Sequence, residues 1–238
     1  MDPVAEIRSD IDKIVRAHSR PMVTLTYAQS LDGSIALRRD ERLTLSGPET
    51  KLLTHRLRAA HDSILVGIGT VLADDPKLTA RRVGGPHPRP VVLDSRLRTP
   101  GAAQVLRHPR GALIAAAEDA DERLEEILRS SGAEVLRVPR AADGLSLPHL
   151  LRILGEIGVR SVMVEGGASV LTSFLKAGLV DWVLVTIAPF FVGGVRAIEP
   201  ISGGKGIETF PGLGEDWRCG RFGRDLVVWG RFRAGGGK

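Results

Sequence analysis

Short apolar runs alternate with amphipathic stretches along the chain from Met22 onward. Runs such as Ser63–Gly67 and Pro90–Asp94 are apolar at nearly every position, which is typical of strands that helices cover on both faces. The pattern predicts strands at Met22–Ala28, Ser63–Val66, Pro90–Asp94, Ala112–Ala116, Glu134–Val138, Ser161–Glu165, Trp182–Ile187, Arg218–Arg221 and Leu226–Arg231. Helices are predicted at Pro48–Ala60, Asp121–Ser130, Leu147–Gly155 and Ala168–Ala177.

This alternation of strands and helices favours a mostly parallel sheet with right-handed crossovers. The last two apolar runs have no helix between them, so we expect an antiparallel hairpin at one edge of the sheet. No repeat or linker divides the chain, and we predict one three-layer α/β domain over residues 21–233. Residues 1–20 carry apolar residues at helical spacing and are expected to form a docking helix, and the Gly-rich residues 234–238 a disordered tail.

The composition is that of an ordinary globular protein, with 238 residues of which 43% are hydrophobic and 26% charged. A chain of this size buries enough surface to fold without stabilisation by a metal ion or a disulfide bond. No apolar run approaches the ~18 residues of a membrane span, and the N-terminus lacks the apolar core of a signal peptide. We therefore expect a cytoplasmic protein with no membrane partner.

Charge and cysteine content narrow the classes of ligand. The 33 basic and 28 acidic residues give a net charge of +5, and the basic residues are scattered while aromatic residues make up only 4%. This pattern argues against nucleic acid as a partner and suits a small anionic ligand better. The single cysteine, Cys219, excludes an internal disulfide and a multi-cysteine zinc site, and the six histidines show no metal-ligand spacing. We predict no metal and give no histidine a catalytic role.

The most informative motif is Glu165-Gly166-Gly167, which joins a buried strand to a helix that begins with small residues. Glycines let the backbone approach an anion closely, and the N–H groups of the first helical turn then point at it. Ser169 and Ser173 would add hydroxyl donors. The motif therefore predicts a pyrophosphate site, although a tight strand-to-helix turn would need the same glycines.

Three further segments follow predicted strands. The first, Gly67-Ile-Gly69, lacks the third glycine of a dinucleotide fingerprint. The Asp74-Asp75-Pro76 sequence after it should end a short helix. The two aspartates suit general acids, metal ligands or residues of a turn. Asp32-Gly33 reads most simply as a turn. Ser95 and Arg96, with Arg58 elsewhere, suit phosphate groups or are solvated surface residues.

Several segments together, in order and spacing, resemble one family: the riboflavin-pathway pyrimidine reductases. This family includes the reductase half of the bacterial deaminase–reductase and standalone archaeal and fungal enzymes. The resemblance spans residues 21–232 and is carried by the motifs Ala28–Gly33, Arg58–Thr79, Val92–Ser95, Val164–Gly167, Ala177–Asp181 and Ile187–Pro189.

The resemblance implies a dihydrofolate-reductase-like fold, a homodimer, and NADPH-dependent reduction of the ribosylamino side chain of a pyrimidinone 5′-phosphate to the ribitylamino form. The implied NADPH contacts are Ala28, Thr70, Asp74, Ser95, Arg96, Gly166, Gly167, Ala168, Ser169, Val170, Leu171, Thr172 and Ser173. The implied substrate contacts are Arg42, Arg58, Leu78, Arg81 and Glu165. Arg58 and Arg81 would hold the 5′-phosphate, and Ser95 with Arg96 the 2′-phosphate of the cofactor.

In the implied chemistry, the ribosylamine opens to an imine-like form whose anomeric carbon accepts a hydride. Glu165 or Asp74 would assist the opening or stabilise the cationic imine. Two positions depart from many bifunctional bacterial members, which carry Lys where this chain has Thr26 and a small residue where it has Gln29. The chain also has no His-x-Glu motif and no paired cysteines for a deaminase zinc, so the substrate is either the aminated or the deaminated pyrimidine.

Two other functions remain open from the sequence. One is a reductase of the same fold that acts on a pterin or folate ring, and the other is a nucleotide-binding homologue without turnover. The homodimer prediction rests on the apolar segments Trp182–Ile187 and Leu226–Trp229, because an exposed apolar sheet edge favours pairing with another chain.

Overall fold

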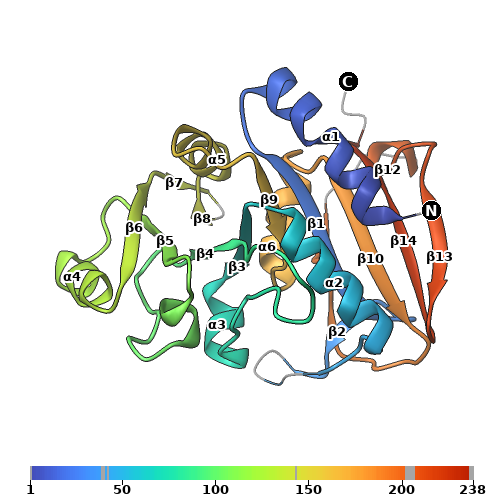
Figure 1. Ribbon diagram of the computed structural model, residues 1–238, viewed down its shortest axis with the longest axis horizontal. Coiled ribbons are helices and arrows are strands. Elements are labelled where there is room, and N and C mark those ends of the chain that lie inside the picture. The colour runs from blue at the N-terminus through green and yellow to red at the C-terminus, as the bar shows by residue number, and fades with distance from the viewer. Residues whose placement is uncertain (1, 39–40, 42, 143, 202–206, 236–238) are drawn as a thin grey trace.

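The computed structural model describes residues 2–38, 41, 43–142, 144–201 and 207–235. Within these residues, one ten-stranded sheet runs through the molecule, and most of its strands are parallel (Figure 1). In order across the sheet, the parallel strands are β10 (Trp182–Ala188), β1 (Met22–Ser30), β9 (Ser161–Val164), β3 (Ser63–Gly67), β4 (Arg89–Leu93), β5 (Ala112–Ala117) and β6 (Ala133–Val138).

Antiparallel strands extend the sheet beyond β10. Strand β14 (Asp225–Arg233) pairs with β10, and β13 (Arg218–Phe222) and β12 (Gly212–Leu213) both pair with β14. Strands β13 and β14 form the edge hairpin that the sequence predicts, whereas β12 was not predicted. Several other strands of two or three residues were not predicted, because such short segments carry no readable periodicity. They are β2 (Ser34–Ala36), which pairs with β11 (Val195–Arg196), and β7 (Arg140–Ala141), which pairs with β8 (Gly144–Leu145).

Helices cover both faces of the sheet, which gives the three layers expected from the sequence (Figure 1). One face carries α1 (Pro3–His18), α2 (Pro48–Ala60), α3 (Ile68–Asp74) and α4 (Glu122–Ser130). The other face carries α5 (Leu147–Glu156) and α6 (Ala168–Lys176). Two single-turn 3-10 helices lie at Gln104–Arg107 and Ile207–Thr209.

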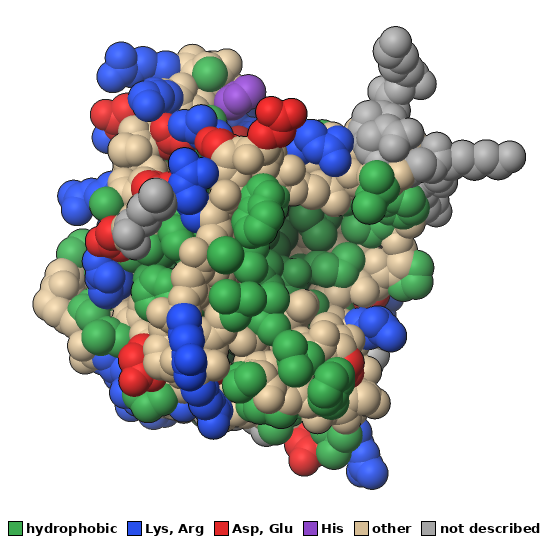
Figure 2. All heavy atoms as spheres, turned by 90° about the vertical axis from the view of Figure 1, so that its right-hand side faces the viewer, with side chains coloured by type: hydrophobic (Ala, Val, Ile, Leu, Met, Phe, Trp, Pro, Cys, Tyr) green, Lys and Arg blue, Asp and Glu red, His purple; other side chains and the backbone are tan. Residues whose placement is uncertain are grey.

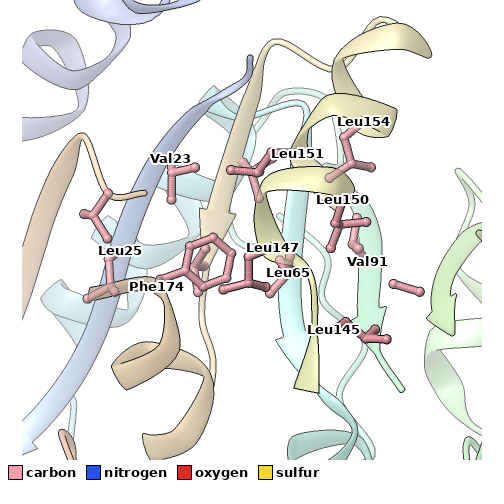
Figure 3. Close-up of a cluster of buried hydrophobic side chains, with 14 of the residues drawn as sticks. Val23, Leu25, Leu65, Val91, Leu145, Leu147, Leu150, Leu151, Leu154 and Phe174 are labelled. Atoms are coloured by element: carbon pink, nitrogen blue, oxygen red, sulfur yellow. The ribbon is translucent and has the colours of Figure 1, made fainter. Parts of the chain in front are cut away.

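Successive side chains of each strand point to opposite faces of the sheet, so the hydrophobic core forms separate clusters on the two faces. Leu65 of β3 packs among residues of α5 and α6, such as Leu147 and Phe174 (Figure 3). Its neighbour Ile64 points to the opposite face and belongs to the cluster that contains residues of α3 and α4. Because both faces are buried, these strands are apolar at consecutive positions, and this property made them recognisable in the sequence.

The N-terminal helix α1 docks on the sheet as expected. Asp2 caps it by accepting a hydrogen bond from the amide of Val4 at 3.1 Å. Farther along, the buried Asp10 accepts from Nε1 of Trp182 at 3.2 Å and from Nε of Arg231 at 2.8 Å. These bonds attach α1 to β10 and β14, which are distant from it in the sequence.

The N-terminus of α2 is capped by a residue from the far end of the chain. Gly47, at the N-cap, has no side chain to satisfy the helix N–H groups. Asp225, fully buried at the start of β14, accepts instead from the amide of Gly47 at 2.7 Å and from the hydroxyl of Thr50. The last hairpin therefore supports the helix that faces the site described below.

We predict that Asp225→Ala lowers the free energy of unfolding by about 1–3 kcal/mol, because it leaves the Gly47 amide and Thr50 hydroxyl buried without an acceptor. Asp119→Ala is the matched control, since Asp119 pairs with Arg140 at the exposed surface and its loss should change the stability far less than the loss of Asp225. Urea unfolding followed by circular dichroism measures both. Equal stability of the two variants would show that the cap contributes nothing.

Candidate active site

A cavity of about 650 Å³ lies at the carboxyl ends of β1, β9 and β3, between α2, α3 and α6. In parallel α/β sheets this edge is where ligands usually bind. The strand ends bring together residues far apart in the sequence, including Ala28 near the end of β1, Gly67 at the end of β3 and Glu165 after β9. The cavity therefore lies where the sequence motifs predicted a site.

Two glycines allow α6 to sit close to the strand ends. A Cβ atom on Gly67 would lie 2.8 Å from Cγ2 of Val170, and one on Gly166 would lie 2.6 Å from Cβ of the same valine. Val170, in the first turn of α6, thus occupies the space that side chains at both positions would need. These glycines are required for packing, and neither has a positive φ angle.

The first turn of α6 provides the N–H groups for an anion. The amide of Leu171 already donates to the carbonyl of Gly167 at 3.1 Å. The amides of Ala168, Ser169 and Val170 precede it and have no carbonyl partner within the helix. No side chain caps the helix at Gly167, so these groups and the positive end of the helix dipole suit a bound phosphate.

An ion pair forms part of the cavity wall. Nε and Nη2 of Arg58 donate to the two carboxylate oxygens of Glu165 at 2.7 and 2.6 Å, and Nη1 donates to the carbonyl of Thr79 at 3.1 Å. Both side chains are mostly buried, 14% and 17% exposed. Burial acts to lower the pKa of Arg58, but the charge and hydrogen bonds of Glu165 outweigh burial and hold that pKa above its ordinary value. The pair is therefore charged and oriented.

More cations gather on the same side of the cavity. Lys51 and Arg58 extend from α2, and Arg81 and Arg82 from the segment after α3. His55 lies between them on α2 and is only 5% exposed. Burial first, and then the positive charges of the neighbouring arginines, lower the pKa of His55 to about 4. This part of the cavity is arranged to receive an anion.

The structure brings most of the predicted site residues together. The residues that line the cavity are Ala28, Arg58, Thr70, Asp74, Leu78, Arg81, Glu165, Gly166, Gly167, Ala168, Ser169 and Val170. Leu78 is nearly buried and has a positive φ of 52°, so the chain turns sharply just before Arg81. Arg42 lies outside the described residues.

Other predicted residues lie away from this cavity. Leu171 is buried in the core, and the hydroxyl of Thr172 donates to the carbonyl of Ala168 at 2.7 Å and accepts from the amide of Glu199 at 2.9 Å. Ser173 follows them on α6. Ser95 and Arg96 follow β4, at the same edge of the sheet as Gly67 at the end of β3.

The paired aspartates and the Asp-Gly turn have separate roles. Asp74 lines the cavity, whereas Asp75 accepts from the amide of Gln104 at 2.7 Å outside it. Asp32 accepts from the hydroxyls of Ser30 and Ser34 and from the amides of Val192 and Gly193. These bonds hold the pKa of Asp32 well below its usual range. Asp32 thus fixes a turn, in agreement with the simplest interpretation of its motif.

The family model described as "RibD C-terminal domain" matches residues 21–227. The chain belongs to the RibD C-terminal domain family. Its relatives include a protein of Methanothermobacter thermautotrophicus named 2,5-diamino-6-ribosylamino-4(3H)-pyrimidinone 5′-phosphate reductase, 42% identical over 88% of this chain and 97% of that one. A protein of the same name from Debaryomyces hansenii is 37% identical over 85% of this chain and 90% of the relative.

Solved structures of this family share the fold. The riboflavin biosynthesis reductase Rib7 of Saccharomyces cerevisiae covers 94% of this chain and all of its own, with a TM-score of 0.71 and 28% identity. RibD of Acinetobacter baumannii aligns over 92% of this chain but 60% of its own length, with a TM-score of 0.78 and 23% identity. The predicted single α/β domain with a mostly parallel central sheet is confirmed, and its fold is that of the RibD and Rib7 structures.

Sequence reasoning missed part of the site in this family member. Lys51, His55 and Arg58 recur at spacings of four and three residues, which places them on one face of α2, and this spacing was a readable signal. Arg82 stands next to the predicted Arg81. Among the described residues, no group of three His, Cys, Asp or Glu side chains is arranged to hold a metal ion. Nor does any helix there combine the length and apolarity needed to span a bilayer.

We predict that Gly67→Ala lowers the free energy of unfolding by about 1–3 kcal/mol, because the new methyl group overlaps Cγ2 of Val170. Adding Val170→Ala removes that atom, so the double variant should lose less stability than the sum of the two single variants. Gly69→Ala is the control, since a Cβ there meets nothing within 4 Å. Thermal unfolding of the four proteins measures the coupling, and strictly additive effects would contradict this packing.

Proposed function

We propose that the protein reduces the ribosylamino side chain of 2,5-diamino-6-ribosylamino-4(3H)-pyrimidinone 5′-phosphate to the ribitylamino form with NADPH, a step of riboflavin biosynthesis. The observation that carries the proposal is the Arg58–Glu165 pair, which lines the same cavity as the first turn of α6 and the cations Lys51, Arg81 and Arg82. This arrangement offers separate places for a dinucleotide and a sugar phosphate. The names of the relatives at 37% and 42% identity support the same reaction.

The aminated pyrimidine is favoured over the deaminated one by the pattern of relatives. Proteins named for the diamino substrate match over 90% and 97% of their own length. A relative named riboflavin biosynthesis protein RibD, from Aquifex aeolicus, is 36% identical, and the match covers 52% of its length. Thr26, at the position where many bifunctional members carry Lys, lines the cavity.

The residues at the carboxyl edge of the sheet fit a dinucleotide with a 2′-phosphate. We assign its pyrophosphate to the amides of Ala168, Ser169 and Val170, where the glycine turn leaves the backbone accessible. Asp94, after β4, is fully buried and accepts from the amide and hydroxyl of Thr99 at 2.7 and 2.8 Å. We assign the 2′-phosphate to Ser95 and Arg96, which follow Asp94 and offer a hydroxyl and a guanidinium as donors.

When bound, NADPH supplies the hydride for the reduction. On the substrate, the bond between C1′ and the ring oxygen breaks, its electron pair stays on oxygen, and C1′ forms a double bond to the side-chain nitrogen. Hydride addition at C1′ and proton uptake by that oxygen complete the ribitylamino chain. We assign to Glu165 the stabilisation of the positive charge that develops at the C1′–nitrogen bond, because its two hydrogen bonds from Arg58 hold the carboxyl group in one orientation in the cavity wall.

Arg58 thereby gains a role that the sequence did not suggest. With three of its N–H groups donating to Glu165 and Thr79, it orients the carboxylate, and only two N–H groups remain for a phosphate. We therefore assign the 5′-phosphate chiefly to Arg81, which lines the same cavity. We assign to Asp74, which also lines the cavity, the proton that the ring oxygen takes up.

We expect purified protein to oxidise NADPH in step with conversion of the diamino substrate, faster than with its deaminated counterpart, and not with dihydrofolate. Absorbance at the NADPH band measures all three. Glu165→Gln should lower kcat about 100-fold, because the neutral amide does not balance the developing charge. Glu134→Gln is the matched control, since Glu134 forms an equally short pair with Arg89 away from the cavity.

Other outcomes would assign the protein elsewhere. Faster oxidation with dihydrofolate would identify a folate-type reductase. Binding of NADPH without oxidation in the presence of either pyrimidine would identify a nucleotide-binding homologue. Full activity of Glu165→Gln would remove the role given to that carboxylate.

The protein is also proposed to form a homodimer through the outer part of the sheet. The sequence prediction needs one correction here: Trp182, Leu184, Val227 and Trp229 are not exposed, because α1 and α2 cover that face. The opposite face of β10 and β14 is only partly covered, and Val185 pairs there with the half-buried Val228. Figure 2 shows hydrophobic side chains gathered on this side of the molecule, with charged side chains around them.

We expect light scattering to give twice the chain mass of 25.6 kDa. Leu226→Glu should shift the protein toward the monomer, because Leu226 lies beside Ile187 on the uncovered face and is 41% exposed. Leu124→Glu on α4, with 39% exposure, is the control and should leave the mass unchanged. A wild-type mass equal to one chain would exclude the dimer. A cytoplasmic location, expected from the sequence, stays a prediction.

A further inference from the structure

One histidine in the cavity wall has a ring nitrogen without a hydrogen-bond partner. His55 lies on α2, one turn before Arg58, and is only 5% exposed. Its Nδ1 atom is buried and has no hydrogen-bond partner. Because the residue lines the cavity, Nε2 is the ring nitrogen that can reach a bound molecule.

A second buried histidine shows what a purely structural one looks like in this protein. His61, one residue after the end of α2, has Nδ1 2.7 Å from the carbonyl of Leu57 and Nε2 2.8 Å from the hydroxyl of Thr24. Both of its ring nitrogens are satisfied, so His61 connects α2 to β1. His55 makes no such connection, although burying an unpaired polar atom costs free energy.

The ring of His55 is suited to donate a hydrogen bond into the cavity. With a pKa lowered to about 4 by burial and by nearby positive charge, it is neutral at physiological pH. A neutral imidazole carries one proton, and Nδ1 has no acceptor for it. The proton is therefore better placed on Nε2, where it faces the cavity.

The charged side chains around His55 indicate the charge of the ligand group that would accept this hydrogen bond. Lys51 and Arg58 lie on its own helix, and Arg81 and Arg82 on the facing segment. Glu165 neutralises Arg58, and Glu41 and Asp74 also line the cavity. The cations outnumber these carboxylates, so the surroundings favour an anion. In the proposed substrate, the anionic group is the 5′-phosphate.

We propose that Nε2 of His55 donates a hydrogen bond to the 5′-phosphate of the substrate, as a binding residue beside Arg81. This assignment rests on the proposed function for the identity of the substrate, but the anion site itself does not. It explains why α2 keeps a buried ring nitrogen without a partner. Nδ1 stays unpaired when the phosphate is bound, and the hydrogen bond from Nε2 offsets the cost of its burial.

The test compares His55→Leu with wild type on the phosphorylated and dephosphorylated substrates. Loss of a hydrogen bond to a charged group should raise KM for the phosphorylated substrate about tenfold or more. KM for NADPH, and kcat/KM for the dephosphorylated substrate, should stay as in wild type. His55→Gln keeps a donor and should recover part of the loss, and His149→Gln on α5 is the control histidine outside the cavity.

Stability separates this role from a structural one. His55→Leu removes the unpaired Nδ1 atom, so its Tm should equal or exceed that of wild type. A lower Tm together with equal losses on both substrates would show that His55 only supports the fold, and would overturn the proposal. Unchanged kinetics on the phosphorylated substrate would overturn it as well.

Titration with inorganic phosphate distinguishes this inference from the proposed function. If no pyrimidine is reduced but wild type binds phosphate more tightly than His55→Leu, the anion site stands and the proposed reaction fails. If the pyrimidine is reduced and both proteins bind phosphate equally, the reaction stands and the role of His55 fails.

Discussion

The close approach of α6 to the ends of β3 and β9 is the constraint on which the site depends. Val170 fills the space beside Gly67 and Gly166, and a methyl group at either glycine would push the helix away. This contact sets the position of the α6 amides relative to Glu165, which comes one residue before Gly166. It also fixes where β3 ends and α3 begins, and so where Thr70 and Asp74 meet the cavity. The contact of Val170 with the two glycines thus positions the residues proposed for the cofactor as well as those proposed for the substrate.

The Arg58–Glu165 pair connects a helix on one face of the sheet to a strand end in the middle of it. Taking both charges out of water is unfavourable, and pairs of this kind add little to stability when they replace apolar contacts. The Arg58–Glu165 pair matters for the site because its two parallel hydrogen bonds hold the carboxylate in one orientation. The surplus of positive charge then lies on the far side of Arg58, around His55. The cavity is consequently divided into a part that stabilises a cation and a part that binds an anion.

The fold was predictable because its signals are local. Apolar runs such as Ser63–Gly67 mark buried strands without knowledge of their neighbours, and helical spacing marks most of the helices. The glycine turn at 166–167 was recognisable for the same reason. By contrast, the cap of α2 joins Gly47 to Asp225, 178 residues later. The sequence near either residue contains no signal that predicts this contact. The missing partner of His55 is likewise a property of the folded neighbourhood, and the burial of Trp229 depends on where α1 docks.

The cap supplied by Asp225 also has a consequence for how the protein is made. Every residue proposed here for catalysis precedes residue 182, so the site-forming segments are synthesised before the hairpin of β13 and β14. Yet α2, which carries Arg58 and His55, gains the acceptor at its N-terminus only when that hairpin has been made and has paired with β10. The pocket is therefore completed by a segment that is made after all the residues lining its catalytic part.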